Sequence, residues 1–371
     1  MKVSILKQDL LPILQAVSRS VGVRSSLPVL ANILIQASKN KLKIAATNLE
    51  IGVIKTASAQ VLEDGETTIP AKTITETIAG LPDQNIDLEV KADILQIQSG
   101  KFQASVNGIS AQEFPVIPTP SGEAVNFDKQ ILLSCTQIMF AAAADGGRPV
   151  LTGILIETKG EKLNFVATDG FRLAFRQISL PKGMGSFKSL IPKRTLEEVV
   201  RIISEDLSGS GEDDKVTISS SQNQNQVIFE VGSTIISSRL IEGQFPDWEK
   251  IIPQKFICRA VVERGELVSA VKLASIFARN EASVVTLEVS VDKISLTSET
   301  KEVGQQQNEV DAQIEGENIK IAFNTRFLLD ALVASDSSSV TMEFSGSLSP
   351  TVIKPVGEEE LIFIVMPIRK D

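Results

Sequence analysis

Histidine is absent from the 371 residues of this chain. Its absence removes the commonest general base and the commonest zinc ligand, and it excludes every Ser-His or Cys-His nucleophile pair. Cysteine is scarce, because Cys135 and Cys258 are the only two and they lie in apolar surroundings without CxxC spacing. We therefore expect no metal site, no cofactor and no disulfide framework, and the sequence favours a function other than catalysis.

Long apolar runs and an excess of basic charge are also missing. No run approaches the ~18 residues of a membrane span, and the first residues lack a signal-peptide cleavage pattern. We expect a cytoplasmic protein with no membrane partner. The net charge of −9 argues against a simple basic nucleic-acid binder. No Walker-type phosphate loop occurs, so the chain has no recognisable means of using ATP.

The sequence does contain an internal repeat. "KLKIAATNLEI" at residues 41–51 nearly returns as "KLNFVATDGFR" at residues 162–172. An ungapped alignment of residues 29–47 with residues 150–168 gives about nine identities in nineteen. A third copy follows with weaker identity and the same order of elements. The chain is thus predicted to hold three copies of one plan, namely helix, strands, helix and strands.

Each copy is predicted to contain two amphipathic helices. The apolar periodicity places them at residues 7–20, 72–80, 128–143, 193–205, 263–279 and 324–334. The expected caps are Asp9, the capping-box pairs Thr73 with Glu76 and Thr195 with Glu198, and Asn324.

The domain boundaries are predicted at the Pro/Gly-rich segments between the copies. Residues 115–123 separate the first two copies, and the segment near Pro253 separates the second from the third. The predicted domains are residues 1–124, 125–252 and 253–371. Each would be an α+β domain with two helices packed on one face of a twisted antiparallel sheet.

With three such copies, the motifs "RSSLPVLANIL", "IPAK", "EFP", "ATDGFRLA", "FPDW" and the terminal "VMPIR" closely resemble the bacterial sliding clamp family, the beta subunit of DNA polymerase III. The resemblance covers residues 1–369. It implies a head-to-tail homodimer that closes into a ring of six domains, with helices lining a hole around double-stranded DNA of any sequence. The implied partners are the polymerase III catalytic subunit, an ATP-dependent clamp loader, and other DNA polymerases and repair proteins.

A sliding ring needs a mildly positive lining, because sequence-independent phosphate contacts permit motion along the duplex. The six helix windows contain about eleven Lys or Arg against about nine Asp or Glu, which leaves the rest of the chain near −11. The expected DNA contacts are Arg24, Arg148, Lys193 and Arg194.

The resemblance also implies a pocket shared by partner proteins, which would accept a short extended peptide with a glutamine and apolar anchors. Its expected lining is Leu151, Thr168, Gly170, Phe171, Arg172, Leu173, Pro246, Lys250, Ile251, Asn324, Phe327, Leu348, Val365, Met366, Pro367, Ile368 and Arg369. For the contact between the two copies of the dimer, the resemblance implies Leu81, Lys101, Val106, Phe277, Glu299 and Glu302.

The second copy of the repeated turn ends in Asp-Gly-Phe-Arg, which we expect to form a tighter turn and to aim Phe171 and Arg172 at the C-terminal "VMPIR". Phe171 stands where many family members have a smaller or polar ring, and Lys250 replaces a common arginine, so the peptide preference is expected to differ. Two alternatives stay open: an enzyme whose acid and base are Asp169 and Arg172, and a clamp paralogue with a narrower set of partners or resistance to an inhibitor.

Overall fold

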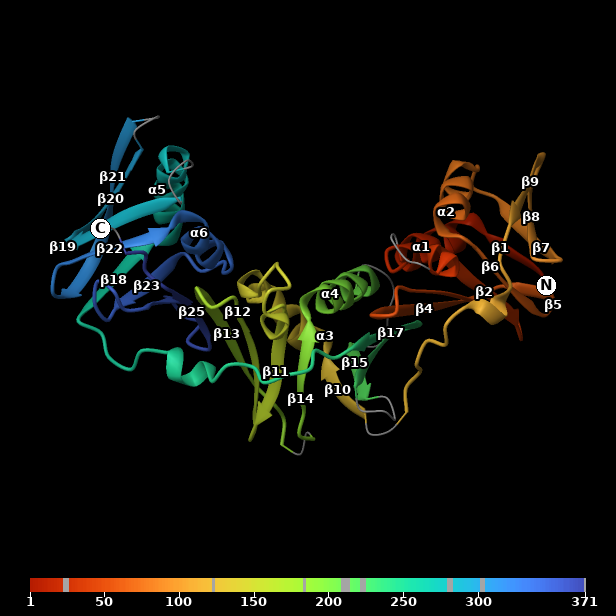
Figure 1. Cartoon of the computed structure of the whole chain (residues 1–371), viewed down its shortest axis with the longest axis horizontal. Helices are drawn as coiled ribbons and strands as arrows, with labels where there is room; N and C mark the ends of the chain where they lie inside the picture. Colours follow the sequence, from red (N-terminus) through yellow and green to blue (C-terminus); the bar gives the residue numbers. More distant parts are fainter. Residues whose placement is uncertain are drawn as a thin grey trace. The chain divides into compact units, whose positions relative to one another are not determined.

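The computed structural model describes residues 1–22, 27–121, 124–182, 185–207, 214–220, 225–278, 283–300 and 304–369. The chain divides into two compact units. Figure 1 labels their helices and strands. Unit 1 comprises Met1–Leu132 and Arg194–Leu240, and unit 2 comprises Leu133–Lys193 and Ile241–Asp371.

Unit 1 is built on two antiparallel sheets. One runs in the order β5-β1-β7-β8-β9 and the other in the order β10-β15-β16-β17-β4-β3-β2-β6. The strands are β1 (Lys2–Leu6), β2 (Asn32–Ser38), β3 (Lys41–Thr47), β4 (Ile51–Ser58), β5 (Gln60–Glu63), β6 (Gly65–Pro70), β7 (Asn85–Lys91), β8 (Ile94–Ser99), β9 (Phe102–Asn107), β10 (Ala124–Asp128), β15 (Lys215–Ser220), β16 (Gln226–Val231) and β17 (Thr234–Arg239).

The helices of unit 1 cover these sheets with their apolar faces. They are α1 (Lys7–Ser18), α2 (Ala71–Gly80), α3 (Lys129–Leu133) and α4 (Lys193–Leu207), with short 3-10 turns η1 (Pro28–Ala31) and η2 (Ala111–Glu113). Leu10, Leu14 and Val17 of α1 are buried at helical spacing. A hydroxyl pair, Ser18 with Thr75 at 2.9 Å, joins α1 to α2.

Unit 2 is built on one antiparallel sheet. Its order is β14-β11-β12-β13-β25-β24-β23-β18-β21-β20-β19-β22. The strands are β11 (Gly153–Lys159), β12 (Lys162–Thr168), β13 (Arg172–Ser179), β14 (Lys188–Pro192), β18 (Cys258–Glu263), β19 (Val284–Ser290), β20 (Lys293–Thr300), β21 (Gly304–Gly316), β22 (Ile319–Asn324), β23 (Ser339–Phe344), β24 (Thr351–Pro355) and β25 (Leu361–Val365).

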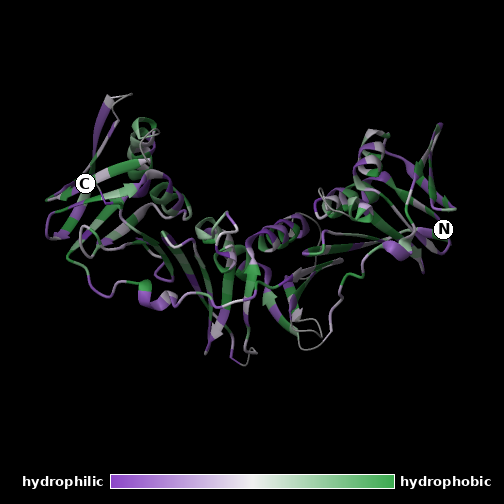
Figure 2. Cartoon of the chain, in the orientation of Figure 1, coloured by the Kyte–Doolittle hydropathy of each residue, from purple (hydrophilic) through white to green (hydrophobic). Residues whose placement is uncertain are grey.

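Two helices and four short turns complete unit 2. They are α5 (Arg264–Phe277), α6 (Thr325–Val333), η3 (Ser134–Gln137), η4 (Met139–Ala141), η5 (Pro149–Leu151) and η6 (Trp248–Ile251). Phe165, Phe323, Phe344 and Phe363 are fully buried in the core. Figure 2 shows apolar residues along the strands and the inner helix faces, while the hairpin tips are hydrophilic. This is the distribution expected when burial of apolar surface drives folding.

The predicted repetition is confirmed by the elements themselves. η1, β2 and β3 of the first copy correspond to η5, β11 and β12 of the second, and the strands β19 and β20 follow α5 in the third. Neighbouring copies share sheets, because β4 pairs with β17 and β13 pairs with β25. For that reason the compact units do not end at 124 and 252, and the three predicted domain ranges stay predictions.

The expected helix caps are mostly wrong. α2 and α4 begin at Ala71 and Lys193, directly after a proline, so Thr73 and Thr195 lie inside the helices rather than at their caps. Asp9 likewise lies in the first turn of α1, whose cap position is Leu6. Proline fixes the backbone in a conformation that can start a helix, which explains the earlier start.

The polar side chains of the predicted capping boxes make other contacts. The Thr195 hydroxyl lies 2.7 Å from that of Ser238. Glu198 accepts hydrogen bonds from Arg19 at 3.1 Å and from Arg201 at 2.9 Å. Glu76 is exposed and lies 3.9 Å from Lys72. Thr195 and Glu198 therefore join α4 to other elements, whereas Glu76 pairs within its own helix.

The helix expected at residues 128–143 is also interrupted. α3 ends at Leu133, and the 3-10 turns η3 and η4 follow it. The Thr136 hydroxyl donates to the Leu133 carbonyl at 2.7 Å. Short hydroxyl side chains compete for backbone hydrogen bonds in this way, which weakens a continuous α-helix.

Candidate functional site

The turn between β12 and β13 is held by the side chains that the sequence singled out. Asp169 Oδ1 accepts hydrogen bonds from the backbone N–H groups of Phe171 at 2.9 Å and Arg172 at 3.0 Å. Thr168 Oγ1 donates to the Arg172 carbonyl at 2.6 Å. Gly170 has a φ of 91°, a conformation that glycine adopts without strain. The turn therefore presents Phe171 at its tip, and Asp169 is engaged in holding it rather than poised for acid–base chemistry.

The turn of the first copy has the same geometry. Asn48 Oδ1 accepts from the backbone N–H groups of Glu50 at 3.0 Å and Ile51 at 2.8 Å, and Thr47 Oγ1 donates to the Ile51 carbonyl at 3.0 Å. Leu49 occupies the positive-φ position, at 76°. The expectation that Asp-Gly makes a tighter turn is therefore wrong, and the two copies differ in their side chains.

The junction of β13 and β25, here called the seam, brings the second copy against the C-terminal segment. Arg172 lies opposite Val365 in the antiparallel register. The Met366 N–H donates to the Phe171 carbonyl at 2.9 Å, one residue beyond the end of β25. The predicted approach of Phe171 and Arg172 to "VMPIR" is confirmed.

Five predicted pocket residues gather at the seam, and we call them the seam cluster: Gly170, Phe171, Arg172, Phe327 and Met366. The rings of Phe171 and Phe327 are stacked with centroids 6.3 Å apart. The Arg172 guanidinium lies 4.6 Å from the Phe327 centroid. Phe171 is 58% exposed, so the cluster offers an apolar surface to solvent beside a cation.

Asn324 positions this cluster by capping α6. Its Oδ1 accepts from the backbone N–H groups of Arg326 at 2.9 Å and Phe327 at 3.4 Å. The predicted cap is therefore confirmed. Because Phe327 lies in the first turn, the cap also fixes the ring that stacks on Phe171.

Asp330 and Phe140 belong to the same cluster of contacts, although the sequence did not single them out. Asp330 accepts a hydrogen bond from Arg172 Nη1, and the Phe140 centroid lies 5.3 Å from the guanidinium. Asp330 lies one and a half turns beyond Asn324 on the amphipathic helix α6. In sequence it reads as an ordinary surface charge, so only the tertiary pairing of β13 with α6 reveals it.

The predicted linker residues contact the opposite face of the seam. Ile251 packs on a buried apolar cluster that contains Leu173, Trp248 and Ile364. Successive side chains of a strand point to opposite faces, so Leu173 faces the linker while Arg172 faces α6. Pro246 is half-buried. The proposed lining is thus divided between two faces of one sheet.

The remaining predicted lining residues differ in accessibility. Lys250 is exposed and pairs with Asp247 at 2.6 Å, and this hydrogen bond together with the aspartate charge raises the pKa of Lys250. Pro367 is half-buried and Arg369 is exposed. The buried members are Leu151, Thr168, Leu173 and Val365.

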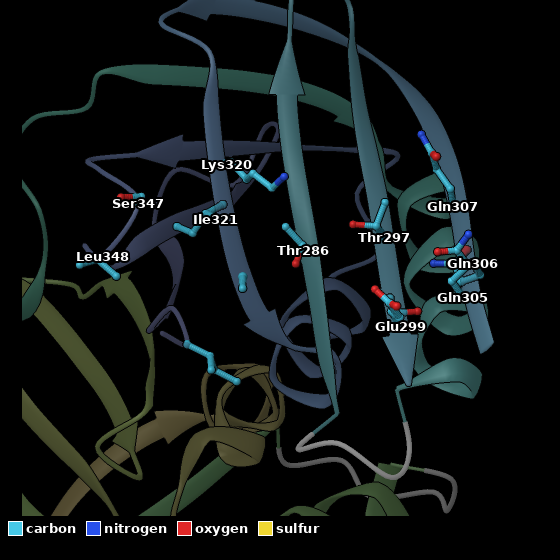
Figure 3. A pocket seen from close by; sticks show the side chains of 13 residues that line it. Thr286, Thr297, Glu299, Gln305, Gln306, Gln307, Lys320, Ile321, Ser347 and Leu348 are labelled. Carbon is cyan, nitrogen blue, oxygen red and sulfur yellow. The ribbon is translucent and has the colours of Figure 1, made fainter. Parts of the chain in front are cut away.

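A cavity of about 840 Å³ lies beside the seam, over strands β19, β20, β21 and β22. Two predicted residues, Leu348 and Ile368, line it. The Ile368 N–H donates to the Ala322 carbonyl at 2.8 Å, which anchors the C-terminal segment at the cavity edge. Figure 3 shows Leu348 on one side of the cavity and Glu299 on the other. Most of the other lining side chains are polar, including Thr286, Thr297, Gln305, Gln306, Gln307 and Lys320.

The structure describes three of the four predicted DNA contacts. Arg24 lies outside the described residues. Lys193 and Arg194 begin α4. Arg148 is exposed, and its Nη1 lies 3.2 Å from the position that a Cβ would take at Gly170. Arg148 therefore borders the seam cluster.

The predicted dimer residues lie on two separate surfaces. Leu81, at the end of α2, is buried, Lys101 is exposed in the turn before β9, and Val106 is half-buried in β9, which ends its sheet. In unit 2, Phe277 ends α5 and is half-buried, and Glu299 is exposed on β20. Glu302 lies outside the described residues.

The sequence reading missed two further candidates on α5. Leu273 is 50% exposed and Ile276 is 46% exposed, although both are large apolar residues. The sequence does indicate an exposed apolar surface on this helix, because "LVSAVKLASIF" is apolar on more than one helical stripe. One stripe fills the core, and the second is left at the surface.

Membrane-spanning helices and metal sites are both absent from the part of the chain that the structure describes. No helix there is long and apolar enough to cross a membrane. No group of three or more cysteine and carboxylate side chains is arranged to hold a metal ion.

Comparison with known families accounts for nearly the whole chain. The DNA polymerase III beta subunit N-terminal domain matches residues 1–118, the central domain residues 128–247 and the C-terminal domain residues 249–369. A beta sliding clamp of Synechocystis is 32% identical, with 100% of this chain and 99% of the relative covered. A beta sliding clamp of Staphylococcus aureus is 30% identical, with coverage of 95% and 94%.

Solved structures agree with these relatives. The DNA polymerase sliding clamp of Bacillus subtilis superposes with a TM-score of 0.93 at 27% identity, and the beta sliding clamp of C. crescentus with a TM-score of 0.93 at 29% identity; each pair covers 100% of both chains. The interpretation of Asp169 and Arg172 as an enzyme's acid and base is wrong, because the relatives are not catalysts. The chain belongs to the DNA polymerase III beta subunit family, the bacterial DNA sliding clamps, which are non-catalytic processivity factors.

Proposed function

We propose that two copies of this chain associate head to tail into a ring around double-stranded DNA and tether the replicative polymerase to it. The repetition of one domain plan along the chain, matched over its full length by sliding clamps, carries this proposal. A ring of repeats holds DNA by enclosure, so tight binding is unnecessary. ATP-dependent opening by a separate clamp loader follows from the closed topology.

The two surfaces that would form the head-to-tail contact are different from each other, as such an interface requires. One is the edge strand β9 with Lys101 and the half-exposed Phe102. The other is the end of α5, where Leu273 and Ile276 are exposed. An apolar centre flanked by Lys101 on one side and Glu299 on the other has the composition of a protein interface.

DNA would be contacted by Arg24, Arg148, Lys193 and Arg194. Arg194 and Arg148 are exposed cations of the described residues. Such side chains bind phosphates regardless of base sequence. The position of Arg148 beside Gly170 also makes it available to a partner peptide.

Partner proteins would dock an extended peptide at the seam cluster and over the adjoining cavity. The polymerase III catalytic subunit, the clamp loader, other polymerases and repair proteins are the proposed owners of such peptides. Exposed Phe171, Leu348 and Met366 suit apolar anchors, and methionine adapts to several shapes. The C. crescentus clamp holds a polyethylene glycol in a region assigned to beta-motif tethering, which supports this use of the fold.

A peptide-binding measurement tests the docking proposal. The probe is a fluorescein-labelled nine-residue peptide with one glutamine and two leucine anchors. Its binding is measured by fluorescence anisotropy. Arg172→Ala, and separately deletion of residues 366–371, should weaken binding by at least about tenfold, because each removes part of the seam cluster. Lys272→Ala, on the exposed side of α5, is the matched control and should bind as the parent does.

The same variants must keep their self-association. Sedimentation velocity should give the parent mass for Arg172→Ala and for the deletion of residues 366–371, because neither change touches β9 or the end of α5. Dissociation into monomers would count against the assignment of the seam to partners. Unchanged peptide affinity in both variants would refute the docking proposal.

A further inference from the structure

The Arg172 side chain is held by contacts with two aromatic rings and two carboxylates. It is only 8% exposed, although it stands at the first position of β13 next to exposed Phe171. Phe140 and Phe327 lie near the guanidinium, at 5.3 and 4.6 Å from their ring centroids. Aromatic rings favour a cation, so this packing fixes the plane of the guanidinium.

Two carboxylates share the charge of this arginine. Asp169 Oδ2 accepts from Nε at 3.0 Å, and Asp330 Oδ2 accepts from Nη1. Asp169 comes from the turn before β13 and Asp330 from α6, so the arginine joins the two sides of the seam. Arg326 approaches Asp330 only to 3.9 Å and is 79% exposed, so solvent screens its charge. The partly buried group of Arg172, Asp169 and Asp330 carries a net charge of −1.

The guanidinium keeps donors for a ligand. Arginine has five N–H groups, and the two carboxylates engage Nε and Nη1. Nη2 makes no hydrogen bond within the described residues, and it is not among the enclosed polar atoms that lack a partner. Nη2 is therefore accessible at the seam cluster, where the proposed peptide would lie.

We propose that Asp330 sets the charge preference of the partner site: by neutralising Arg172 it lets the seam accept a neutral hydrogen-bond acceptor and reject a carboxylate. A main-chain carbonyl or a carboxamide can accept from Nη2 without further cost. A carboxylate at the same place would meet Asp169 and Asp330, which both pair with the same guanidinium, and like charges in an interface are strongly disfavoured. This inference rests on the proposed docking of peptides at the seam.

In this arrangement Asp330 acts through Arg172 and need not touch the peptide, so it is a positioning residue. Removing its charge while keeping its shape leaves Arg172 with one carboxylate and makes the group neutral. The site should then tolerate an acidic side chain near Nη2. The affinity for neutral peptides should change much less, because the Nη2 donors remain.

The test is a scan of the labelled nine-residue probe peptide, in which each position is replaced in turn by aspartate or by asparagine. Anisotropy titrations use the full chain, its Asp330→Asn variant, and Asp336→Asn as a control that removes one exposed charge just beyond α6. In the parent, at least one position should bind the aspartate peptide about tenfold or more weakly than the asparagine peptide. Asp330→Asn should reduce that ratio by about tenfold at the same position, and Asp336→Asn should leave it unchanged.

A charge-conserving variant separates this role from a purely structural one. Asp330→Glu should keep the discrimination against aspartate, whereas a general disturbance of α6 would weaken both peptides of each pair alike. Equal aspartate-to-asparagine ratios in the parent and in Asp330→Asn would overturn the inference while leaving the docking proposal intact. If the unsubstituted probe does not bind the parent at all, the docking proposal itself fails.

Discussion

At the scale of single residues, one short stretch of the chain performs two tasks in its two copies. Asn48 and Asp169 hold turns of the same length with equivalent backbone hydrogen bonds. The following positions carry Glu50 in the first copy and Phe171 in the second. Identical backbone geometry with different side chains thus separates a structural turn from a proposed docking surface.

Trp248 packs the linker against the sheet of unit 2. Its ring stacks on Phe175 with centroids 4.7 Å apart, and its Nε1 donates to Glu157 at 3.3 Å. Glu157 is almost fully buried. Burial is the largest influence on its pKa and raises it, but the hydrogen bond from Lys188, the charges of Lys159 and Lys188 and the Trp248 bond together lower it.

Glu157→Gln should therefore destabilise the fold in a pH-dependent way. The folded-state pKa lies below the unfolded value of about 4.3, so the carboxylate stabilises the protein above that pH and loses its effect as the pH falls through the folded value. Urea unfolding at pH 7 should show a loss of about 1–3 kcal/mol, as for hydrogen bonds to charged groups, and a smaller loss at pH 3.5. Glu249→Gln, an exposed carboxylate 2.6 Å from Lys159, is the control. A deficit that is the same at both pH values would contradict the assignment.

At the scale of elements, apolar periodicity predicted which segments form helices and strands, and the repeat predicted their order. It did not predict the helix caps correctly, because α2 and α4 begin directly after a proline and ahead of Thr73 and Thr195. It could not predict the interruption after α3, where Thr136 bonds to the backbone. The motif residues of the seam were predicted, whereas Asp330 and Phe140 were not. Their contacts with Arg172 arise from the packing of α6 and η4 near the start of β13, which no local pattern encodes.

The exposed face of α5 carries a prediction about self-association. Leu273→Asp places a charge in an apolar patch that the proposed dimer would bury, so the dissociation constant should rise by at least about tenfold. Sedimentation equilibrium measures this. Lys272→Asp also introduces a carboxylate on α5 but removes no apolar side chain, and it should have a smaller effect. A parent-like dimer in Leu273→Asp would place the interface elsewhere.

At the scale of the whole molecule, repetition extends to the strand pairs that join neighbouring copies. β4 pairs with β17 as β13 pairs with β25, and in each case the residue that follows the last paired position of the second strand donates its N–H to the turn. The Arg239 N–H donates to the Glu50 carbonyl at 3.0 Å, as Met366 does to Phe171 at 2.9 Å. A closed arrangement of similar domains requires equivalent strand pairs between successive domains.

The central claim, that DNA is held by enclosure, is tested most directly on nicked circular DNA. The labelled protein is loaded with a clamp loader and ATP, and free protein is removed by gel filtration. The DNA is then either left circular or cut once with a restriction enzyme. The account predicts retention on the circle and rapid loss after linearisation, because a ring slides off a free end. Equal loss from both forms, or equal retention on both, would contradict it.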